Sequence, residues 1–366
     1  MLNILSNRTY RHLFMAQVIA LIGTGLATVA LGLLAYDLAG DRAGAVLGTA
    51  LAIKMSAYIL VAPVAAAFAD KFPRRTMLVT LDLVRALVAI TLPFVTQIWE
   101  IYILIFILQA ASAAFTPTFQ ATIPDILPDE REYTRALSLS RLAYDLESVI
   151  SPMLAAALLT VMSFHNLFAG TAVGFLASAA LVVSVTLPKM KALTVKRSIY
   201  DKTTRGMRIF LKTPRLRGLL ALNMAVAAAS AMVIVNTVVL VQADFGFSQR
   251  STAIALAFFG VGSMVSALVL PRLLDNMSDR MPMLAGTALL VIGLGSGIFL
   301  KDYITLVVLW ALLGVGYSLS QTPGGRLLRR SSTAEDRPAL FAAQFALSHS
   351  CWLVTYPLAG WVGAAW

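Results

Sequence analysis

The chain alternates between long apolar runs and short polar segments. Each run is about 20 residues long, and a helix of that length crosses the roughly 30 Å hydrocarbon core of a bilayer. Most charged residues fall between the runs rather than within them. The pattern predicts eleven membrane-spanning helices, at residues 12–36, 43–68, 76–96, 100–124, 138–162, 165–187, 218–242, 251–271, 282–300, 303–323 and 338–361.

The composition also indicates that the chain is surrounded by lipid. Of the 366 residues, 59% are hydrophobic and only 13% are charged. A water-soluble core of this size could not bury so much apolar surface, so lipid must be part of the solvent. We therefore expect an all-α integral membrane protein. The single cysteine, Cys351, excludes a disulfide framework and a thiolate metal cluster.

The positive charge of the chain is concentrated in one segment. The net charge is +11, and residues 188–217 hold ten Lys/Arg against one acid, Asp201. A basic segment beside a membrane span more often sets topology and contacts anionic lipid headgroups than binds nucleic acid. We expect the lipid bilayer as a partner and no nucleic acid.

Basic residues in alternate loops indicate the orientation. If the N-terminus faces the cytoplasm, 23 of the 29 Lys/Arg lie on that side. Only three lie on the opposite side: Arg42, Arg250 and Lys301. Because basic residues near span ends are retained in the cytoplasm, we expect a cytoplasmic N-terminus in a bacterial inner membrane.

The order of the spans divides the chain into two lobes. Residues 1–187 form an N-terminal lobe of six predicted helices, and residues 218–366 form a C-terminal lobe of five. The basic segment 188–217 is the cytoplasmic linker between them.

Within the linker, apolar side chains recur at helical spacing among the charges, at Ile199, Thr203, Met207 and Phe210. This spacing predicts an amphipathic helix that lies on the cytoplasmic face. A solvated connector with no role beyond joining the lobes is the alternative.

Two loops at corresponding places in the lobes share a pattern. Residues 69–75 read ADKFPRR, and residues 271–280 read PRLLDNMSDR. Each loop has an acid near a helix end, then a turn residue, then arginine. Transporter halves related by an axis along the membrane normal leave such weak internal symmetry.

The first of these loops resembles the signature of the major facilitator superfamily, Gly-x-x-x-Asp-Arg/Lys-x-Gly-Arg-Arg/Lys between helices 2 and 3. The charged positions are matched by Asp70, Lys71, Arg74 and Arg75. Ala66 and Pro73 replace the two glycines, and Asp275 and Arg280 form a partial second copy. Ser151 precedes a proline in helix 5, where exporters of this superfamily often carry Gly-Pro.

This resemblance implies a two-lobed helical bundle that acts as a secondary transporter of the efflux type, similar to siderophore exporters and nickel-resistance permeases. The superfamily fold has twelve helices, so we expect that this chain is truncated before the twelfth. The resemblance also implies that the charged loops form a conformational gate, made of Asp70, Lys71, Arg74, Arg75, Asp275 and Arg280.

Charges inside the spans need an explanation, because each costs about 2.5–3.5 kcal/mol at mid-membrane on insertion scales. They are Lys54, Asp82, Arg85, Arg141, Asp145 and Glu147. Asp82 and Arg85 are i,i+3 neighbours that can pair on one helix face. Arg141 and Asp145 are i,i+4 neighbours, whereas Glu147 points about 200° away from Asp145.

Two interpretations of these charges remain open. Either Asp145 or Glu147 binds the coupling proton, with Lys54 as a fixed counter-ion, or all of them form a structural network. We expect a monomer that exports a small molecule by alternating access in exchange for protons. A divalent-metal or siderophore exporter and a non-transporting membrane scaffold or sensor are the alternatives. The sequence contains no Walker loop and no His/Cys cluster, so we expect no enzyme activity, no cofactor and no metal site.

Overall fold

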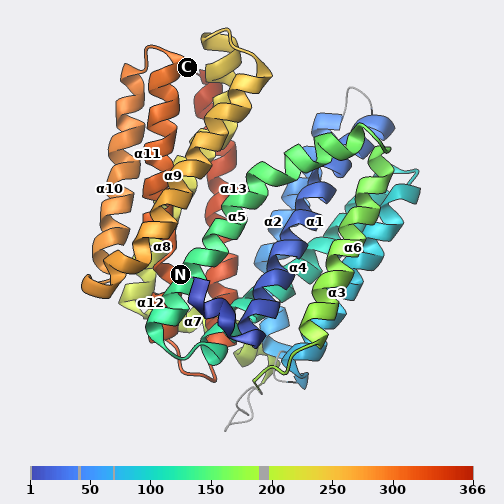
Figure 1. Ribbon diagram of the computed structural model, residues 1–366, viewed down its shortest axis with the longest axis vertical. Helices are drawn as coiled ribbons and strands as arrows, with labels where there is room; N and C mark the ends of the chain where they lie inside the picture. The colour runs from blue at the N-terminus through green and yellow to red at the C-terminus, as the bar shows by residue number, and fades with distance from the viewer. Residues whose placement is uncertain (1, 40–42, 69–70, 189–197, 366) are drawn as a thin grey trace. The chain divides into compact units, whose positions relative to one another are not determined.

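The computed structural model describes residues 2–39, 43–68, 71–188 and 198–365, and every regular element in these ranges is helical (Figure 1). Asp70, part of the predicted gate, lies outside the described residues. The α-helices are α1 (Arg8–Ala39), α2 (Ala43–Phe68), α3 (Arg74–Thr91), α4 (Ile98–Ile126), α5 (Glu130–Leu159), α6 (Phe164–Val183), α7 (Ile199–Lys212), α8 (Pro214–Val238), α9 (Gln249–Asn276), α10 (Arg280–Ser296), α11 (Tyr303–Gln321), α12 (Gly324–Arg330) and α13 (Arg337–Ala365).

The expected all-α membrane class is confirmed. In the described part of the chain, nine segments are long and apolar enough to cross a membrane, and they coincide with α1–α4, α6 and α8–α11. Of the remaining two predicted spans, 338–361 lies within α13, and 138–162 overlaps α5 up to its end at Leu159; the two helices are 29 and 30 residues long. The predicted number of eleven spans therefore stays a prediction.

Contacts between residues divide the chain into two compact units, which we describe separately. The first unit consists of Met1–Pro128, Glu147–Phe210 and Ser332–Ala346. The second unit consists of Asp129–Leu146, Leu211–Ser331 and Leu347–Trp366. The lobe limits that we predicted from the order of the spans are a separate division and stay a prediction.

In the first unit, α1 and α6 approach each other closely. A Cβ atom on Gly23 would lie 3.2 Å from the Thr171 carbonyl oxygen, so a larger residue would push the helices apart. The Thr171 hydroxyl donates a hydrogen bond of 2.8 Å to the Gly23 carbonyl. Small residues that bring two backbones together, with a hydroxyl bonding across, are typical of helix packing in membranes. The core beside this contact contains Leu26, Phe168 and Phe175.

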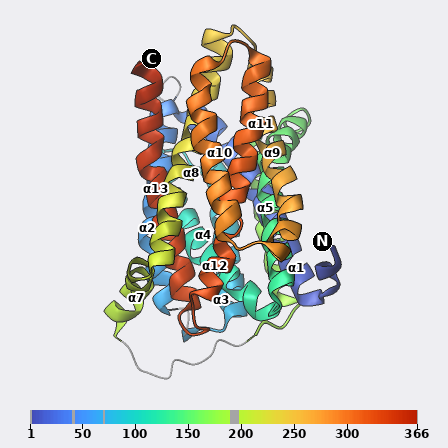
Figure 2. The same cartoon turned by 90° about the vertical axis from the view of Figure 1, so that its left-hand side faces the viewer.

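In the second unit, α9 and α11 pack with even less space between them, and α10 lies beside α11 (Figure 2). A Cβ atom on Gly262 or on Gly314 would lie 1.9 Å from a backbone oxygen of the facing helix. From the middle of α11, the Trp310 indole N–H donates a hydrogen bond of 2.7 Å to the Thr237 hydroxyl of α8. These contacts hold α8, α9 and α11 together without any charged group.

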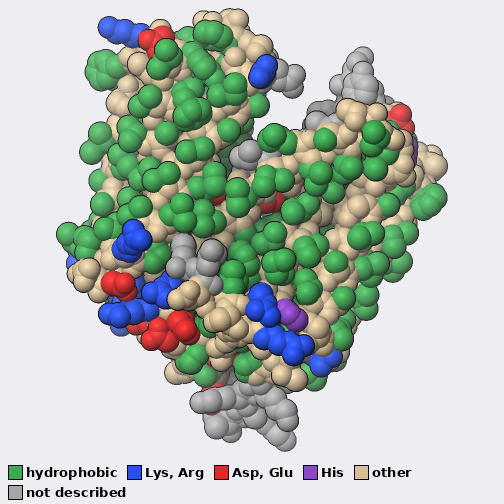
Figure 3. Space-filling view, in the orientation of Figure 1, with side chains coloured by type: hydrophobic (Ala, Val, Ile, Leu, Met, Phe, Trp, Pro, Cys, Tyr) green, Lys and Arg blue, Asp and Glu red, His purple; other side chains and the backbone are tan. Residues whose placement is uncertain are grey.

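The outward surfaces of the helices are apolar in both units. Figure 3 shows hydrophobic side chains along the visible helices, with Lys, Arg, Asp and Glu gathered near helix ends. Exposed examples are Leu60 and Leu87 in the first unit and Ile292 and Val308 in the second, each more than half exposed. Such a surface is stable in lipid, because the exposed side chains are apolar and the helices satisfy their backbone polar groups internally.

Candidate functional site

Arg74 of the predicted gate is held in a buried cluster of the first unit. It is the first residue of α3, and its side chain is 4% exposed. Its guanidinium donates to Asp125, in the last turn of α4, over 2.6 Å. The second carboxylate oxygen of Asp125 forms an ion pair with Arg337, the first residue of α13. We call Arg74, Asp125 and Arg337 the first-unit cluster, in which one carboxylate joins the ends of three helices.

The other basic residues of the same predicted gate lie outside this cluster. Lys71 is exposed, and its ammonium lies 4.7 Å from the centroid of the Phe68 ring. Arg75 is exposed as well. Asp125 and Arg337 were not predicted from the sequence. The signal for Asp125 was its position as the only acid in the last turns of α4, a helix of mostly apolar residues.

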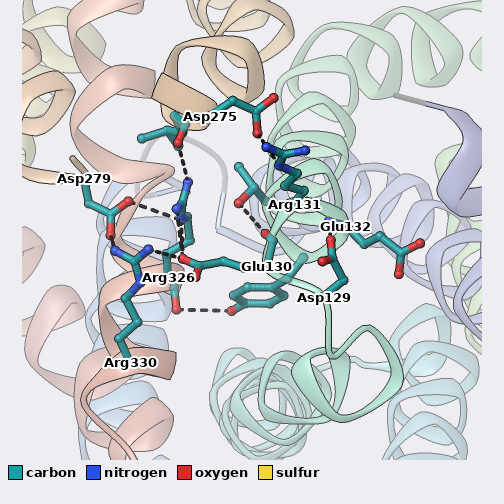
Figure 4. Close-up of polar contacts among 12 residues, drawn as sticks. Asp129, Glu130, Arg131, Glu132, Asp275, Asp279, Arg326 and Arg330 are labelled. Atoms are coloured by element: carbon teal, nitrogen blue, oxygen red, sulfur yellow. Dashed lines mark hydrogen bonds and ion pairs between the residues drawn. The ribbon is translucent and has the colours of Figure 1, made fainter. Parts of the chain in front are cut away.

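The second unit contains a similar cluster, shown in Figure 4. Asp279, just before α10, is 5% exposed and lies between two arginines of α12. Its distances are 3.2 Å to Arg326 and 2.6 Å to Arg330. Glu130, the first residue of α5, contacts the same two arginines at 2.8 and 2.5 Å. We call these four residues the second-unit cluster.

Burial affects the acid at the centre of the second-unit cluster. Burial raises the pKa of the Asp279 carboxyl above its ordinary value, and the positive charges of Arg326 and Arg330 oppose this increase. Asp279 therefore depends on both arginines to remain ionised. Removing either arginine would leave a desolvated carboxylate with too little compensation.

The residues that the second loop pattern selected lie at the edge of this cluster. Asp275 is 3.3 Å from Arg131, and the two side chains are 38% and 72% exposed. Arg280 is exposed and forms no ion pair with another described residue. An exposed pair such as Asp275–Arg131 contributes about 0–1 kcal/mol to stability. Within the loop after α9, the acid that lies between arginines is Asp279.

A third charged group lies deeper along α5 in the second unit. The Nε atom of Arg141 donates to Asp145 over 3.0 Å, and the Asp145 side chain is 4% exposed. Another guanidinium nitrogen donates to the Tyr317 hydroxyl over 3.0 Å, while the guanidinium carbon lies 4.6 Å from the Tyr317 ring centroid. Tyr317, on α11, was not predicted; its only sequence signal is a polar hydroxyl within an apolar run. The arrangement places Asp145 beside a fixed cation.

Glu147, two residues further on, belongs to the first unit and faces α1. A Cβ atom on Gly25 would lie 2.6 Å from its carboxylate oxygen and 2.2 Å from the Ser151 Cβ. Lys54 is the cation that interacts electrostatically with Glu147. The Lys54 ammonium lies 5.7 Å from the Tyr58 ring centroid. Glu147 and Asp145 therefore have different cationic neighbours, Lys54 and Arg141.

The remaining predicted pair, Asp82 and Arg85, is enclosed in the first unit. Asp82 is fully buried, accepts a hydrogen bond of 2.8 Å from Ser178 and forms an ion pair with Arg85. The Arg85 guanidinium lies between two aromatic rings, 4.1 Å from Phe115 and 4.5 Å from Phe175. Such packing on every side is typical of a structural ion pair that links α3, α4 and α6.

Among the described residues, no group of three or more His, Cys, Asp or Glu side chains is arranged to hold a metal ion. The candidate site is a set of ion pairs at helix ends together with a few charges along α5. Several spanning helices with charges at their ends and a few charges within the spans are the arrangement expected of a membrane transporter.

Comparison with known proteins identifies the family. The model for the Major Facilitator Superfamily matches residues 13–235 and 219–366, so the chain belongs to this superfamily. The resemblance stated from the loop after the second helix is therefore confirmed.

Three relatives are similar over different lengths. An uncharacterized MFS-type transporter of Bacillus subtilis, YfiS, is 24% identical over 78% of this chain and 70% of its own length. Macrolide efflux protein A of Enterococcus faecalis is 25% identical over 39% of this chain and 47% of its own length. Multidrug resistance protein MdtG of Dickeya zeae is 28% identical over 44% and 40% of the two chains.

Two solved structures share the fold. The human organic anion transporter MFSD10 superposes with a TM-score of 0.78 at 14% identity, covering 98% of this chain and 94% of that one. The fucose:proton symporter of E. coli, FucP, gives a TM-score of 0.77 at 12% identity over 97% and 92% of the two chains. At such identities the similarity shows the fold and does not extend to the substrate.

Proposed function

We propose that this transporter exports a small molecule from the bacterial cytoplasm by alternating access, in exchange for protons. Similarity to proteins named for macrolide efflux and multidrug resistance supports the direction, although each of them covers less than half of this chain. The paired clusters of ion pairs support alternating access. The charges on α5 support proton coupling. The N-terminus faces the cytoplasm in this proposal, because 23 of the 29 basic residues then lie on that side.

The first-unit and second-unit clusters are the observation that carries the proposal. In each, one acid lies between two arginines that come from a helix end or a short helix; Asp125 is 21% exposed and Asp279 is 5% exposed. Alternating access requires contacts at loops and helix ends that form in one state and separate in another. Charge-assisted pairs suit this role because they are directional, and because water can replace the partner once the contact opens.

Coupling to protons is assigned to α5. Asp145 has the strong, fixed cation Arg141 as its partner, whereas Glu147 is influenced by the more flexible ammonium of Lys54. A lysine that moves away leaves a carboxylate in the membrane uncompensated, and binding a proton removes that cost. We therefore assign Glu147 as the residue that alternates between the ionised and the protonated form.

The experiment that tests this function is transport by the purified protein in liposomes. A pH gradient is imposed across the vesicles, and a panel of cationic dyes, macrolides, siderophores and Ni²⁺ is supplied. We expect uphill movement of at least one organic compound that collapses when a protonophore dissipates the gradient. Transport of Ni²⁺ alone would favour the metal exporter, and transport that ignores the pH gradient would contradict proton coupling.

The orientation has its own test. Reporter fusions to the linker, residues 188–217, report which side of the membrane it occupies. We expect the cytoplasm, since ten basic residues lie in this segment. A linker found outside the cell would overturn the assignment of direction.

A further inference from the structure

Helix α7 of the linker is docked onto the start of α13 within the first unit. A Cβ atom on Gly206 would lie 2.0 Å from the carbonyl oxygen of Ala339, so the two backbones are in direct contact. No residue larger than glycine fits at that distance unless the helices separate. Phe210, one helical turn further on, is fully buried. The apolar face of α7 is therefore packed against protein at these positions.

An ion pair fixes the same contact. The Arg205 guanidinium donates two hydrogen bonds to the Asp336 carboxylate, over 2.5 Å from Nε and 2.8 Å from Nη2. The hydrogen bonds to Asp336 raise the pKa of Arg205 above its ordinary value. A bidentate arginine–carboxylate pair fixes orientation as well as distance, which a single contact does not. Here it defines the position of the residue just before α13.

The next residue along the chain belongs to the first-unit cluster. Asp336 binds α7, and Arg337 binds Asp125 of α4. Because the two residues are consecutive, a shift of α7 that moves Asp336 also moves the backbone that carries Arg337. We infer that α7 is a positioning element of the gate, in which Arg205 and Gly206 hold the start of α13 where Arg337 completes the first-unit cluster.

This inference rests on the proposed gate, and it gives the linker a function that the order of the spans does not assign. Only Thr213 separates the end of α7 at Lys212 from the start of α8 at Pro214. The linker helix thus connects the start of α8 to a residue beside Arg337. A conformational change that displaces the start of α8 would reach the first-unit cluster through α7.

The test compares two glycines that are close in sequence. Gly206→Ala introduces a Cβ atom into the contact with Ala339, whereas a Cβ atom at Gly218 meets no atom within 4 Å. We expect Gly206→Ala to lower the transport rate by roughly fivefold or more, the size of a typical coupling between sites, and Gly218→Ala to leave it unchanged. Equal rates in the two variants would contradict the inference.

A double-mutant cycle separates positioning from a general loss of structure. If α7 acts through Arg337, then Gly206→Ala should lower transport in the wild-type background and add nothing in an Arg337→Gln background. Independent, multiplicative losses in the two backgrounds would show that α7 does not act through the cluster. If Gly206→Ala fails to fold, a charge reversal of the Arg205–Asp336 pair provides a second test. We expect Arg205→Asp alone to lower the transport rate and the double variant Arg205→Asp/Asp336→Arg to restore it. A double variant that does not restore the rate would count against the inference.

A measurement that needs no substrate distinguishes failure of this inference from failure of the proposed function. Spin labels are attached to cysteines introduced at the exposed residues Thr76 and Met281, one in each unit, while the native Cys351 is buried. We expect Gly206→Ala to shift the distance distribution in the same direction as Arg337→Gln. A shift with Arg337→Gln alone would overturn the positioning role even if transport is confirmed. A shift with both, in a protein that transports no compound, would retain the positioning role and reject export.

Discussion

Arg337, the first residue of α13, forms an ion pair with Asp125 in the last turn of α4, although 212 positions separate them in the chain. Asp125 also binds Arg74 of the superfamily loop over 2.6 Å. An arginine of the loop signature therefore pairs with an acid that lies outside the signature. Neutralising that acid should release both arginines together.

We expect Asp125→Asn to remain folded and to lower the transport rate roughly tenfold, within the usual range of coupling free energies. Asparagine keeps the shape of the side chain and removes the charge on which Arg74 and Arg337 converge. The measurement is initial-rate transport in liposomes. Asp37→Asn is the matched control, because Asp37 is exposed and forms no hydrogen bond or ion pair with another described residue. Wild-type rates in Asp125→Asn would remove the first-unit cluster from the gate.

Burial distinguishes two arginines that both pair with acids in the second unit. Arg326 is 8% exposed and forms ion pairs with Asp279 and Glu130. Arg131 is 72% exposed and forms an ion pair with Asp275. Arg326→Met should lower the free energy of unfolding by about 3 kcal/mol or more, because it leaves the buried Asp279 with only the more exposed Arg330 as a partner. Arg131→Met should change it by less than about 1 kcal/mol. Thermal unfolding in detergent measures both, and similar losses would show that burial does not govern this cluster.

The sequence predicted the helical membrane class because the relevant signal is local. An apolar run of about 20 residues specifies a spanning helix wherever it occurs, and the superfamily loop is a contiguous motif. The same holds for neighbours on one helix: Arg141 and Asp145 are four residues apart, and the structure brings them into an ion pair. Spacing within a helix fixes which side chains share a face.

Contacts between residues of different helices could not be predicted from spacing along one helix. Asp125 and Arg337 come from helices distant in the chain, and no local period relates them. In the second loop, the sequence pattern selected Asp275, an acid at the end of α9. The structure instead places the buried Asp279 between arginines, and its position in the motif did not indicate this. Tyr317 likewise meets Arg141 only because α11 packs beside α5 in the second unit. Tertiary packing decides such contacts, and one sequence alone does not encode them in a readable pattern.

Asp302 gives a prediction about pH. It caps α11, and its carboxylate accepts a hydrogen bond of 2.8 Å from the Thr305 backbone N–H and another of 3.0 Å from the Thr305 hydroxyl. The hydrogen bonds to Thr305 lower the pKa of Asp302 below its ordinary value of 3.8. For a carboxyl with a lowered pKa, the stabilisation is complete above pH 3.8 and is lost as pH falls through the folded-state pKa.

We therefore expect Asp302→Ala to lower the melting temperature at pH 7 and to differ less from the wild type as the pH is lowered below 3.8. Thermal unfolding in detergent at a series of pH values provides the measurement. Asp37→Ala is the control for loss of an exposed acid. A difference between Asp302→Ala and the wild type that stays constant over the whole series would show that the charge of the cap contributes nothing.

The two acids on α5 should respond in opposite ways when each is neutralised. Asp145→Asn leaves Arg141 without its carboxylate in the membrane, and breaking such a buried pair costs about 3–5 kcal/mol. We expect a lower folded yield and a lower melting temperature from this variant. Folded yield equal to that of the wild type would show that Tyr317 alone suffices to hold the guanidinium.

Glu147→Gln should instead fold normally, because glutamine imitates the protonated carboxyl that occurs in the proposed transport cycle. Glutamine has nearly the same size as glutamate, so its side chain still fits beside Gly25 and Ser151. A permanently neutral residue can bind substrate and exchange it, but it cannot carry a proton between the two sides. Substrate exchange between the two faces of a vesicle should therefore survive, while uphill export driven by a pH gradient should be lost. Measuring both activities on one preparation excludes a folding defect, since exchange requires the folded protein. If Glu147→Gln still exports uphill with the same dependence on the pH gradient, the charges on α5 are structural and the proton is bound elsewhere or not at all.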